Sequence, residues 1–330
     1  MRHQHSPAPD PVSERERDAD LAWSVVLAAA RSAERLAQSN QAAAFAVGDD
    51  GQLQLVPMED PQALIAWRPD TGWQLVIPDE DPRHALIDLY LPICSATAAR
   101  PITVGHLGQS LDGFIATHAG ESRFVTGPEN ILHLHRLRAL CDAVVVGAGT
   151  VAADDPQLTT RLVAGPTPLR VVLDPARRLG DTHRVFSDDK AETLYVCARS
   201  LVGADELMFG QAVVVGVEDT ANGIDVAELL GLLRGRGCTR VFVEGGGVTV
   251  SMFLEANLLD RLHMAIAPLI IGDGRPAIRL SPPAALSDCH RPRYRVFRMG
   301  TDVLFDCDLS SSGVQADDQP DQQPPISRVI

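Results

Sequence analysis

The chain has 330 residues, of which 45% are apolar, with a net charge of −14 and a pI near 5.1. This composition is enough for one large hydrophobic core or two modest ones, and no stretch approaches the roughly 18 uninterrupted apolar residues of a membrane span. The acidic balance argues against broad binding to nucleic acid, which needs a basic face, so we expect small-molecule partners and no membrane or nucleic-acid partner.

The cysteines and basic residues carry two further indications. The six cysteines form no CxxC pair and no even framework, and the first residues lack the apolar core of a signal peptide. We therefore predict a cytoplasmic protein. Lys190 is the only lysine among the 29 basic residues, so a clamp for phosphate must rely on arginine.

The first third of the chain predicts a small structural region. Residues 1–16 are polar and contain proline, which indicates a disordered lead. Residues 17–98 predict a small α+β region, with helical spacing over 18–36 and two hairpins at 43–56 and 64–77. No HxE or PCxxC zinc pattern occurs there, so we expect this region to be structural or dimer-forming.

Residues 99–309 show apolar runs that alternate with helical stretches. The predicted strands are 102–107, 143–147, 169–174, 193–197, 212–217, 240–244, 262–268, 294–299 and 302–307. The predicted helices are 128–140, 225–236 and 248–258. Together they indicate an α/β domain with a mixed, mostly parallel sheet flanked by helices and an antiparallel edge. Residues 310–330 are rich in Ser, Gln, Asp and Pro, and we expect a disordered tail.

One strand leads directly through glycines into a helix. Strand 240–244 ends at Glu244, and Gly245-Gly246-Gly247 precedes the helical pattern. A helix N-terminus after such a turn presents unpaired N–H groups that attract a phosphate, and a carboxylate at the end of a buried strand is a candidate for chemistry. Two alternatives remain open: the glycines only make a tight turn, and Glu244 only caps the helix.

Four motifs occur together in this second region: Gln109-Ser-Leu-Asp-Gly113, Ala119-Gly-Glu-Ser122, the segment 147–156 containing Gly-Ala-Gly-Thr and Ala-Asp-Asp-Pro, and Val243-Glu-Gly-Gly-Gly247. In this order, residues 100–309 resemble the reductase domain of riboflavin biosynthesis, with its dihydrofolate-reductase-like fold. The resemblance implies NADPH-dependent reduction of 5-amino-6-(5-phosphoribosylamino)uracil to its ribitylamino form, without a deaminase module.

The resemblance also implies a cofactor site. The residues that it assigns to NADPH are Gly108, Phe124, Thr150, Asp154, Gly246, Gly247, Val248, Thr249, Val250, Ser251 and Met252. Phe124 stands where the family often has tryptophan beside the nicotinamide, and the segment from Gly246 would hold the pyrophosphate. Residues taken alone leave Asp154 and Asp155 open as a turn or cap pair.

The substrate carries a 5-phosphate, which a guanidinium binds well. The matching positions are Ser122, Arg138, Leu158 through its backbone, Arg161 and Glu244. If the family resemblance is set aside, an alternative stays open for each arginine. Arg138 would be a partner of the helix dipole, and Arg161 would be a solvent-exposed side chain. Glu244 either orients the ribose hydroxyls or handles the proton, and the sequence does not separate these roles.

Two positions depart from the family pattern. His106 stands where family members commonly carry lysine, so it is either a catalytic-site residue that acts when protonated or a structural histidine. Pro175 stands where the family places a small hydroxyl residue near the adenosine 2′-phosphate, so the sequence leaves the preference for NADPH over NADH open. Arg177 and Arg178 are candidates to replace that contact.

The remaining histidines predict no metal site. His133 and His135 are two apart on a helix, so they point to different faces and we expect surface roles for both. His263 lies in an apolar strand, where a packed histidine is the common case.

We therefore interpret the chain as a pyrimidine reductase. Members of the family that it resembles are typically dimers, so we expect a homodimer. The alternatives are a same-fold reductase of another nitrogen heterocycle, such as a dihydropterin, and a non-catalytic nucleotide-binding or assembly protein.

Overall fold

The structure, a computed structural model, describes residues 14–48, 52–123, 125–220 and 223–310. Most of the predicted disordered lead, the first hairpin turn at 49–51 and the predicted tail from 311 lie outside these residues. The chain divides into two compact units, residues 1–96 and 97–330. The first helix begins at Glu14, so residues 14–16, which we assigned to the disordered lead, are helical.

The first unit is a four-stranded antiparallel sheet with two helices. Its elements are α1 (Glu14–Ser39), β1 (Ala43–Val47), β2 (Leu53–Val56), β3 (Ile65–Arg68), β4 (Gly72–Leu75) and α2 (His84–Cys94). The strand order is β2-β1-β3-β4, so both predicted hairpins are present. On α1, buried residues such as Ala22, Val25, Val26 and Ala29 recur at helical spacing. The indole N–H of Trp73 in β4 donates to the carbonyl of Ala29 at 3.1 Å and ties the sheet to α1.

The second unit contains the long sheet. Its main strands are β5 (Ile102–Ser110), β7 (Ala143–Gly147), β8 (Leu169–Leu173), β9 (Thr193–Ala198), β11 (Ala212–Val217), β14 (Arg240–Glu244), β15 (Arg261–Ala267), β17 (Arg293–Met299) and β18 (Asp302–Asp308). Shorter strands are β6 (Phe114–Thr117), β10 (Met208–Phe209), β12 (Asp219–Thr220), β13 (Gly223–Ile224) and β16 (Gly274–Pro276). The α-helices are α3 (Pro128–Leu140), α4 (Ala148–Asp154), α5 (Arg184–Ser187), α6 (Val226–Gly235) and α7 (Gly247–Glu255).

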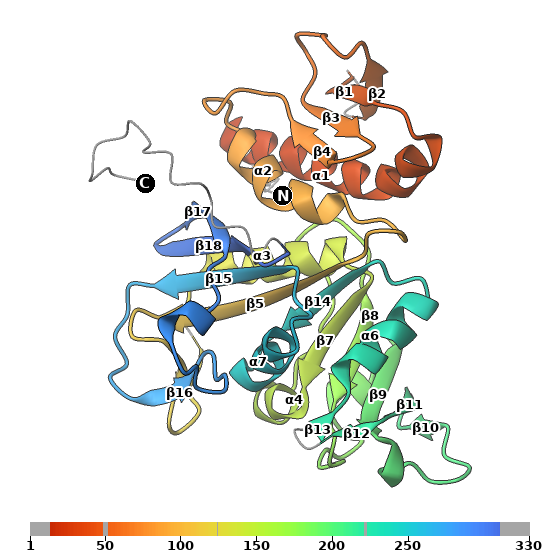
Figure 1. The fold of residues 1–330 in the computed structure, drawn as a ribbon, viewed down its shortest axis with the longest axis vertical. Coiled ribbons are helices and arrows are strands. Elements are labelled where there is room, and N and C mark those ends of the chain that lie inside the picture. The colour runs from red at the N-terminus through yellow and green to blue at the C-terminus, as the bar shows by residue number, and fades with distance from the viewer. Residues whose placement is uncertain (1–13, 49–51, 124, 221–222, 311–330) are drawn as a thin grey trace, which may run out of the picture. The chain divides into compact units, whose positions relative to one another are not determined.

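The ten-stranded sheet has the order β10-β11-β9-β8-β7-β14-β5-β15-β18-β17 (Figure 1). The strands from β11 to β15 are parallel, and the pairs at both ends of the sheet are antiparallel. Apolar β-branched runs such as Val144-Val145-Val146 fit a strand buried on both faces. The prediction of a mixed, mostly parallel sheet with an antiparallel edge is confirmed.

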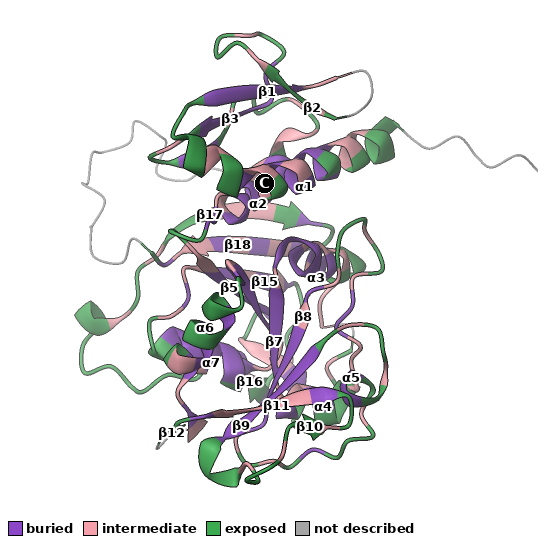
Figure 2. Ribbon diagram, turned by 90° about the vertical axis from the view of Figure 1, so that its right-hand side faces the viewer, coloured by how far each residue is buried: buried purple, intermediate pink, exposed green. Residues whose placement is uncertain are grey.

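Different helices pack against the two faces of the sheet. Alternate side chains of β14, Val241 and Val243, belong to the main hydrophobic core together with leucines of α6 and with Val250 and Phe253 of α7. Figure 2 shows α6 and α7 on one side of the strands and α3 on the other. On the α3 side, Glu244 of β14 ion-pairs with a side chain of α3. The same strand thus contributes apolar residues to the core and its terminal carboxylate to the opposite face.

The chain connections run towards opposite edges of the sheet from the neighbouring strands β7 and β14. From β7 the chain continues through α4 to its neighbour β8, whereas from β14 it continues through α7 to β15 on the other side of β5. In open α/β sheets, ligands bind at the carboxyl ends of strands at such a switch point. We therefore expect a ligand to bind at the turns that follow β7 and β14.

Candidate active site

The turns after β7 and β14 interlock at the switch point. Thr150 of α4 lies against the second turn, since a Cβ built on Gly246 would be 3.1 Å from its Oγ1. In return, a Cβ built on Gly147 would collide with Oγ1 of Thr249 in α7. Each threonine thus occupies the space that a side chain on the facing glycine would need, and the two helix N-termini are held together.

The three glycines after β14 have different reasons to be glycine. Gly245 and Gly246 have φ values of 78° and 25°, in the left-handed region that other residues rarely adopt. Gly247 is buried, and a Cβ there would collide with the backbone carbonyl of Ala277. The tight-turn interpretation therefore explains all three. What remains for a ligand is the start of α7, where the amides of Gly247 and Val248 have no partner among the described residues.

Glu244 and Arg138 form one unit, although the sequence suggested two separate substrate contacts. The guanidinium of Arg138 donates from Nε to Oε2 at 2.7 Å and from Nη2 to Oε1, and its Nη1 donates to the carbonyl of Thr159 at 3.3 Å. Arg138 is 6% exposed and Glu244 is 8% exposed. The bidentate pair fixes the carboxylate at the end of β14 and engages both of its oxygens.

Arg161 extends this unit towards solvent. Its side chain is exposed, and its backbone N–H donates to Nδ1 of His135 at 3.2 Å. Partial burial, followed by the positive charges of Arg138 and Arg184, lowers the pKa of Arg161. Among the described residues no carboxylate ion-pairs with Arg161. Arg138 and Arg184 therefore both lie near Arg161, and these three residues, the arginine cluster, gather positive charge in a setting for an anion.

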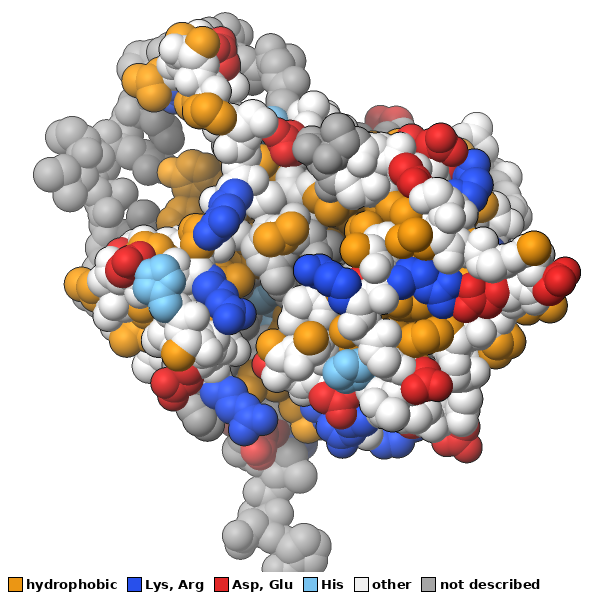
Figure 3. Space-filling view, turned by 90° about the horizontal axis from the view of Figure 1, so that it is seen from below, with side chains coloured by type: hydrophobic (Ala, Val, Ile, Leu, Met, Phe, Trp, Pro, Cys, Tyr) orange, Lys and Arg blue, Asp and Glu red, His pale blue; other side chains and the backbone are white. Residues whose placement is uncertain are grey.

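Arg184 belongs to this cluster but was not predicted. Its backbone N–H donates to Oδ1 of Asp155 at 2.8 Å, and its Nη1 approaches the Asp155 carbonyl at 3.4 Å. No local pattern marks Arg184, because it joins the site only through a residue 29 positions earlier. Figure 3 shows Lys and Arg side chains gathered across the middle of the face seen from below, around a narrow recess.

The two aspartates after α4 have different roles. Asp155 is the C-cap of α4, with a left-handed φ of 41°, and besides Arg184 it lies 3.5 Å from Nδ1 of His183. Asp154, the last residue of α4, is exposed. The local structure therefore uses Asp155 and leaves Asp154 available to a ligand.

His106 does not fit the expected protonated role. It is 3% exposed and its Nε2 lies 2.9 Å from Oδ1 of Asn130. Burial, followed by the charge of His263, lowers the pKa of His106 to about 3. A neutral imidazole does not replace the charge of a lysine, so these surroundings favour the structural alternative for His106. The register places His106 beside Glu244 on neighbouring strands.

Several other predicted ligand positions are constrained. Val250 is fully buried in the main core, and the hydroxyl of Ser251 accepts the backbone N–H of Arg279 at 2.8 Å, so the side chains of these two residues are not available to a cofactor. Val248, by contrast, is 69% exposed at the start of α7, and Met252 is partly buried.

The remaining predicted residues have separate surroundings. Gly108 is close to Thr126, and the buried Leu158 has a left-handed φ of 55°. Ser122 is half-buried in the loop before α3, and the described contacts do not join it to the arginine cluster. Phe124 lies outside the described residues.

One predicted substitute for the 2′-phosphate contact is already engaged. Arg177 ion-pairs with both oxygens of Glu206 and lies 5.5 Å from the ring centre of Tyr195. Arg178 has a side chain that is 74% exposed and lies 4.0 Å from Asp174. Of the two arginines, only Arg178 has a guanidinium available to a ligand.

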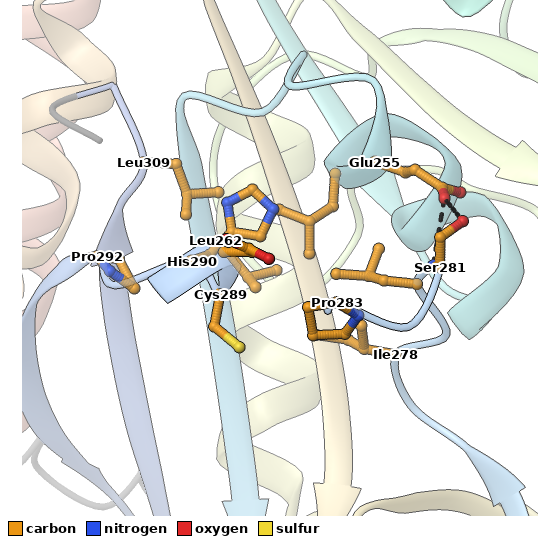
Figure 4. Close-up of a pocket in the computed structure, with 12 residues that line it drawn as sticks. Glu255, Leu262, Ile278, Ser281, Pro283, Cys289, His290, Pro292 and Leu309 are labelled. Carbon is orange, nitrogen blue, oxygen red and sulfur yellow. Dashed lines mark hydrogen bonds between the residues drawn. The ribbon is translucent and has the colours of Figure 1, made fainter. Parts of the chain in front are cut away.

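A separate pocket of about 480 Å³ lies where the carboxyl end of α7 meets the start of β15 (Figure 4). Its wall is mainly apolar, including Leu262, Ile278 and Leu309, and the hydrogen bonds from Ser281 to Glu255 close one side. None of the predicted site residues lines it. The candidate active site is therefore the arginine cluster and the paired turns, not this pocket.

The comparisons with known proteins agree on the second unit. The RibD C-terminal domain family matches residues 102–303. A 2,5-diamino-6-ribosylamino-4(3H)-pyrimidinone 5′-phosphate reductase of Methanothermobacter thermautotrophicus is 36% identical over 213 residues, which are 63% of this chain and 97% of that protein. A riboflavin biosynthesis protein RibD of Bacillus amyloliquefaciens is 36% identical over 165 residues, covering 49% of this chain but only 44% of that protein.

A solved structure supports the same fold. A diaminohydroxyphosphoribosylaminopyrimidine deaminase/5-amino-6-(5-phosphoribosylamino)uracil reductase of Thermotoga maritima aligns with a TM-score of 0.53 and 27% identity, over 69% of this chain and 62% of that one. An Acinetobacter baumannii RibD structure aligns with a TM-score of 0.56 at 23% identity, which supports the fold alone.

Proposed function

Because the chain belongs to the RibD C-terminal domain family, we propose that it is a pyrimidine reductase of riboflavin biosynthesis. The family resemblance predicted from the four motifs is confirmed. The proposed substrate is 5-amino-6-(5-phosphoribosylamino)uracil, which is reduced to its ribitylamino form.

The observation that carries this proposal is the Arg138–Glu244 pair with Arg161 beside it. A substrate with a sugar phosphate needs a cationic group for the phosphate and acceptors for the hydroxyl groups. Arg161 offers an exposed guanidinium, and Glu244 offers oxygens whose positions are fixed by Arg138. Since both oxygens of Glu244 already accept from a guanidinium, we propose that it orients the ribose hydroxyls and does not deliver the proton.

We propose NADPH as the cofactor. The described residues fit a dinucleotide, because the start of α7 offers backbone N–H groups and the positive end of its dipole beside the exposed Val248. Thr150, Asp154 and the Gly246–Thr249 segment would hold it, and Arg178 would contact the adenosine 2′-phosphate. When bound, NADPH supplies the hydride. The chain's own residues bind the phosphate, orient the sugar and keep the carboxylate in a partly dry setting.

A second heterocycle is favoured by one specific observation. The archaeal relative whose sequence matches over 97% of its length is named for a 2,5-diamino-pyrimidinone substrate and not for the uracil. Both substrates carry the ribose 5-phosphate, so the arginine cluster serves either. They differ on the pyrimidine ring, where the sequence offers no distinguishing residue.

An anaerobic assay that follows nicotinamide absorbance tests the proposal. We expect oxidation of NADPH with at least one of the two phosphorylated pyrimidines, and much weaker activity with the same compounds after removal of the phosphate. Comparing the two phosphorylated compounds decides between the heterocycles. A lack of oxidation with both, at every pH between 5 and 9, would favour the non-catalytic alternative.

We also propose that the protein is a cytoplasmic homodimer. The cysteines are free throughout the described part of the chain, which fits a reducing compartment. No helix in the described segments has the length and continuous apolar character needed to cross a membrane. Light scattering at several protein concentrations tests the dimer.

A further inference from the structure

Helix α3 packs on the sheet through polar side chains. Asn130, His133, His135 and Arg138 are all buried, with exposures of 4%, 1%, 1% and 6%. The prediction that His133 and His135 lie on the surface is therefore wrong. Buried polar groups need partners, and three of these four side chains have theirs on different strands of the sheet.

Three of these contacts follow the helix from its first turn to its last. Asn130 contacts His106 of β5 at 2.9 Å, and Nε2 of His133 lies 3.1 Å from Nδ1 of His263 in β15. Arg138 then pairs with Glu244 of β14. The helix is thus tied to three neighbouring strands, and the His133 contact lies in the middle.

The strand side of the His133 contact is itself anchored. Nε2 of His263 lies 3.2 Å from Oδ1 of Asp306 in β18, although the angle is poor for a hydrogen bond. Asp306 is fully buried and accepts hydrogen bonds from Arg261 and Arg295, with shortest distances of 2.6 Å in both cases. The rings of His133 and His263 also stack, with centres 5.1 Å apart. His263 therefore has a fixed position and orientation.

This anchoring bears on the active site through the geometry of the helix. His133 and Arg138 are five residues apart, which corresponds to about 7.5 Å along a helix axis, so a shift of α3 moves both together. A hydrogen bond weakens steeply when its donor and acceptor move out of line, so these polar contacts restrict shifts of α3 on the sheet. A misplacement of about 1 Å in a site can reduce catalysis by as much as about a hundredfold.

We propose that His133, held by His263 and Asp306, is a positioning residue that fixes α3 on the sheet and so keeps Arg138 against Glu244. This inference rests on the proposed function, because the consequence for turnover requires that the pair serves the substrate. His133 itself contacts neither Arg138 nor Glu244 in the described contacts, and it acts through the helix that it shares with Arg138.

The first test compares two buried residues of α3. His133→Leu removes the contact with His263, whereas Leu137→Ala removes apolar packing from a fully buried neighbour and leaves the polar contacts in place. Both variants should lose stability. The proposal expects a large fall in kcat/KM for His133→Leu, with a rise in KM for the phosphorylated substrate, and kinetics near wild type for Leu137→Ala. His133→Gln, which keeps a side-chain donor, should restore much of the loss.

A second test uses non-additivity. If His133 acts through the ion pair, the double variant His133→Leu/Glu244→Gln should be little worse than the poorer single variant, whereas independent effects multiply. The proposal would be overturned if the losses in kcat/KM of the two single variants multiply in the double variant. It would also be overturned if the kinetics of His133→Leu match those of Leu137→Ala. If His133→Leu does not fold, His263→Leu removes the same contact from the strand side, because leucine has no polar atom in place of Nδ1.

A third readout does not depend on activity. The Nε–H of Arg138 should give a protected signal in nitrogen-15 NMR spectra, assigned by its loss in Arg138→Lys. We expect this signal to shift or exchange rapidly in His133→Leu and to persist in Leu137→Ala. Persistence in both variants would refute the positioning role even if the reductase assay gave no activity, so failure of the proposed function and of this inference are distinguishable.

Discussion

Arg161 differs from Arg138 because no described carboxylate pairs with its guanidinium. Loss of a charge-assisted contact to phosphate costs about 1.5–3 kcal/mol, so Arg161→Ala should raise KM for the phosphorylated substrate by about 10- to 100-fold with little change for NADPH. Arg199→Ala is the matched control, since Arg199 pairs with Glu218 and Glu228 and its loss changes the net charge equally. Equal weakening of cofactor and substrate in steady-state kinetics would contradict separate sites.

Glu244 combines a site role with a structural one. Glu244→Gln leaves Arg138 buried beside a neutral amide that keeps one acceptor oxygen. Breaking a buried ion pair outright costs about 3–5 kcal/mol, and we expect a smaller loss here. Turnover should fall together with the urea midpoint, measured in the same preparation. A variant with reduced stability but unchanged turnover would mean that Glu244 serves the fold alone.

Individual roles could be predicted only in part from the sequence. The strand-end position of Glu244 and the guanidinium of Arg161 follow from local pattern and family motifs. The pairing of Glu244 with Arg138 does not, because 106 residues separate them. For the same reason, the ion pair between Arg177 and Glu206 could not be predicted from the sequence. Arg177 and Arg178 are adjacent, and the sequence gives no sign that Glu206 pairs with the first.

At the scale of elements, α3 was predicted at its observed bounds, but its orientation was not. A proline at the first helical position marks its start, while its residues show little separation of apolar and polar faces. The buried side includes histidines whose partners lie on strands far along the chain. The pattern of apolar and polar residues therefore led us to predict that His133 and His135 face solvent. Short elements such as α4 and β6 were also missed, because so few residues give no periodicity.

The buried histidine of β5 predicts how stability depends on pH. In the unfolded chain an imidazole takes up a proton near pH 6.5, whereas the pKa of folded His106 is lowered to about 3. Unfolding therefore takes up a proton between these values, and the free energy of unfolding falls as the pH falls, by up to about 1.4 kcal/mol per pH unit for one group. Burial also lowers the pKa of His133, which adds to this slope.

Urea unfolding between pH 6.5 and 5 measures this effect above the range in which ordinary carboxylates titrate. His106→Gln retains an amide donor for Asn130 and should show a shallower slope than wild type. His118→Gln is a suitable control, because His118 is largely exposed, with a side chain 70% accessible. Parallel slopes for His106→Gln and wild type would show that His106 does not stay neutral in the folded protein.

For the whole molecule, the order of strands and helices predicted the fold class of the second unit, and four short motifs predicted its family. The first unit carried no chemical signature, and the family match begins only at residue 102. Its role stays a prediction, either structural or dimer-forming. The sequence could not supply the sheet order, because strand neighbours such as β14 and β5 are distant in the chain.

Removal of residues 1–96 tests that role. Units defined by their own internal contacts can often fold alone, so a chain beginning at Thr97 should keep reductase activity if the first unit lies outside the site. Light scattering then reports whether the dimer persists. Loss of turnover in a folded, truncated protein would assign the first unit a part in the site.

The interlocked turns have an evolutionary consequence. The hydroxyl of Thr249 excludes any methyl group at position 147, while the Thr249 Cβ would lie 3.7 Å from it, in ordinary contact. Gly147 has an extended backbone, which alanine adopts freely. Gly147→Ala should therefore be harmful alone and tolerated with Thr249→Ala, but not with Thr249→Val, whose branch fills the same space. Homologous chains should accordingly exchange these two positions as a linked pair.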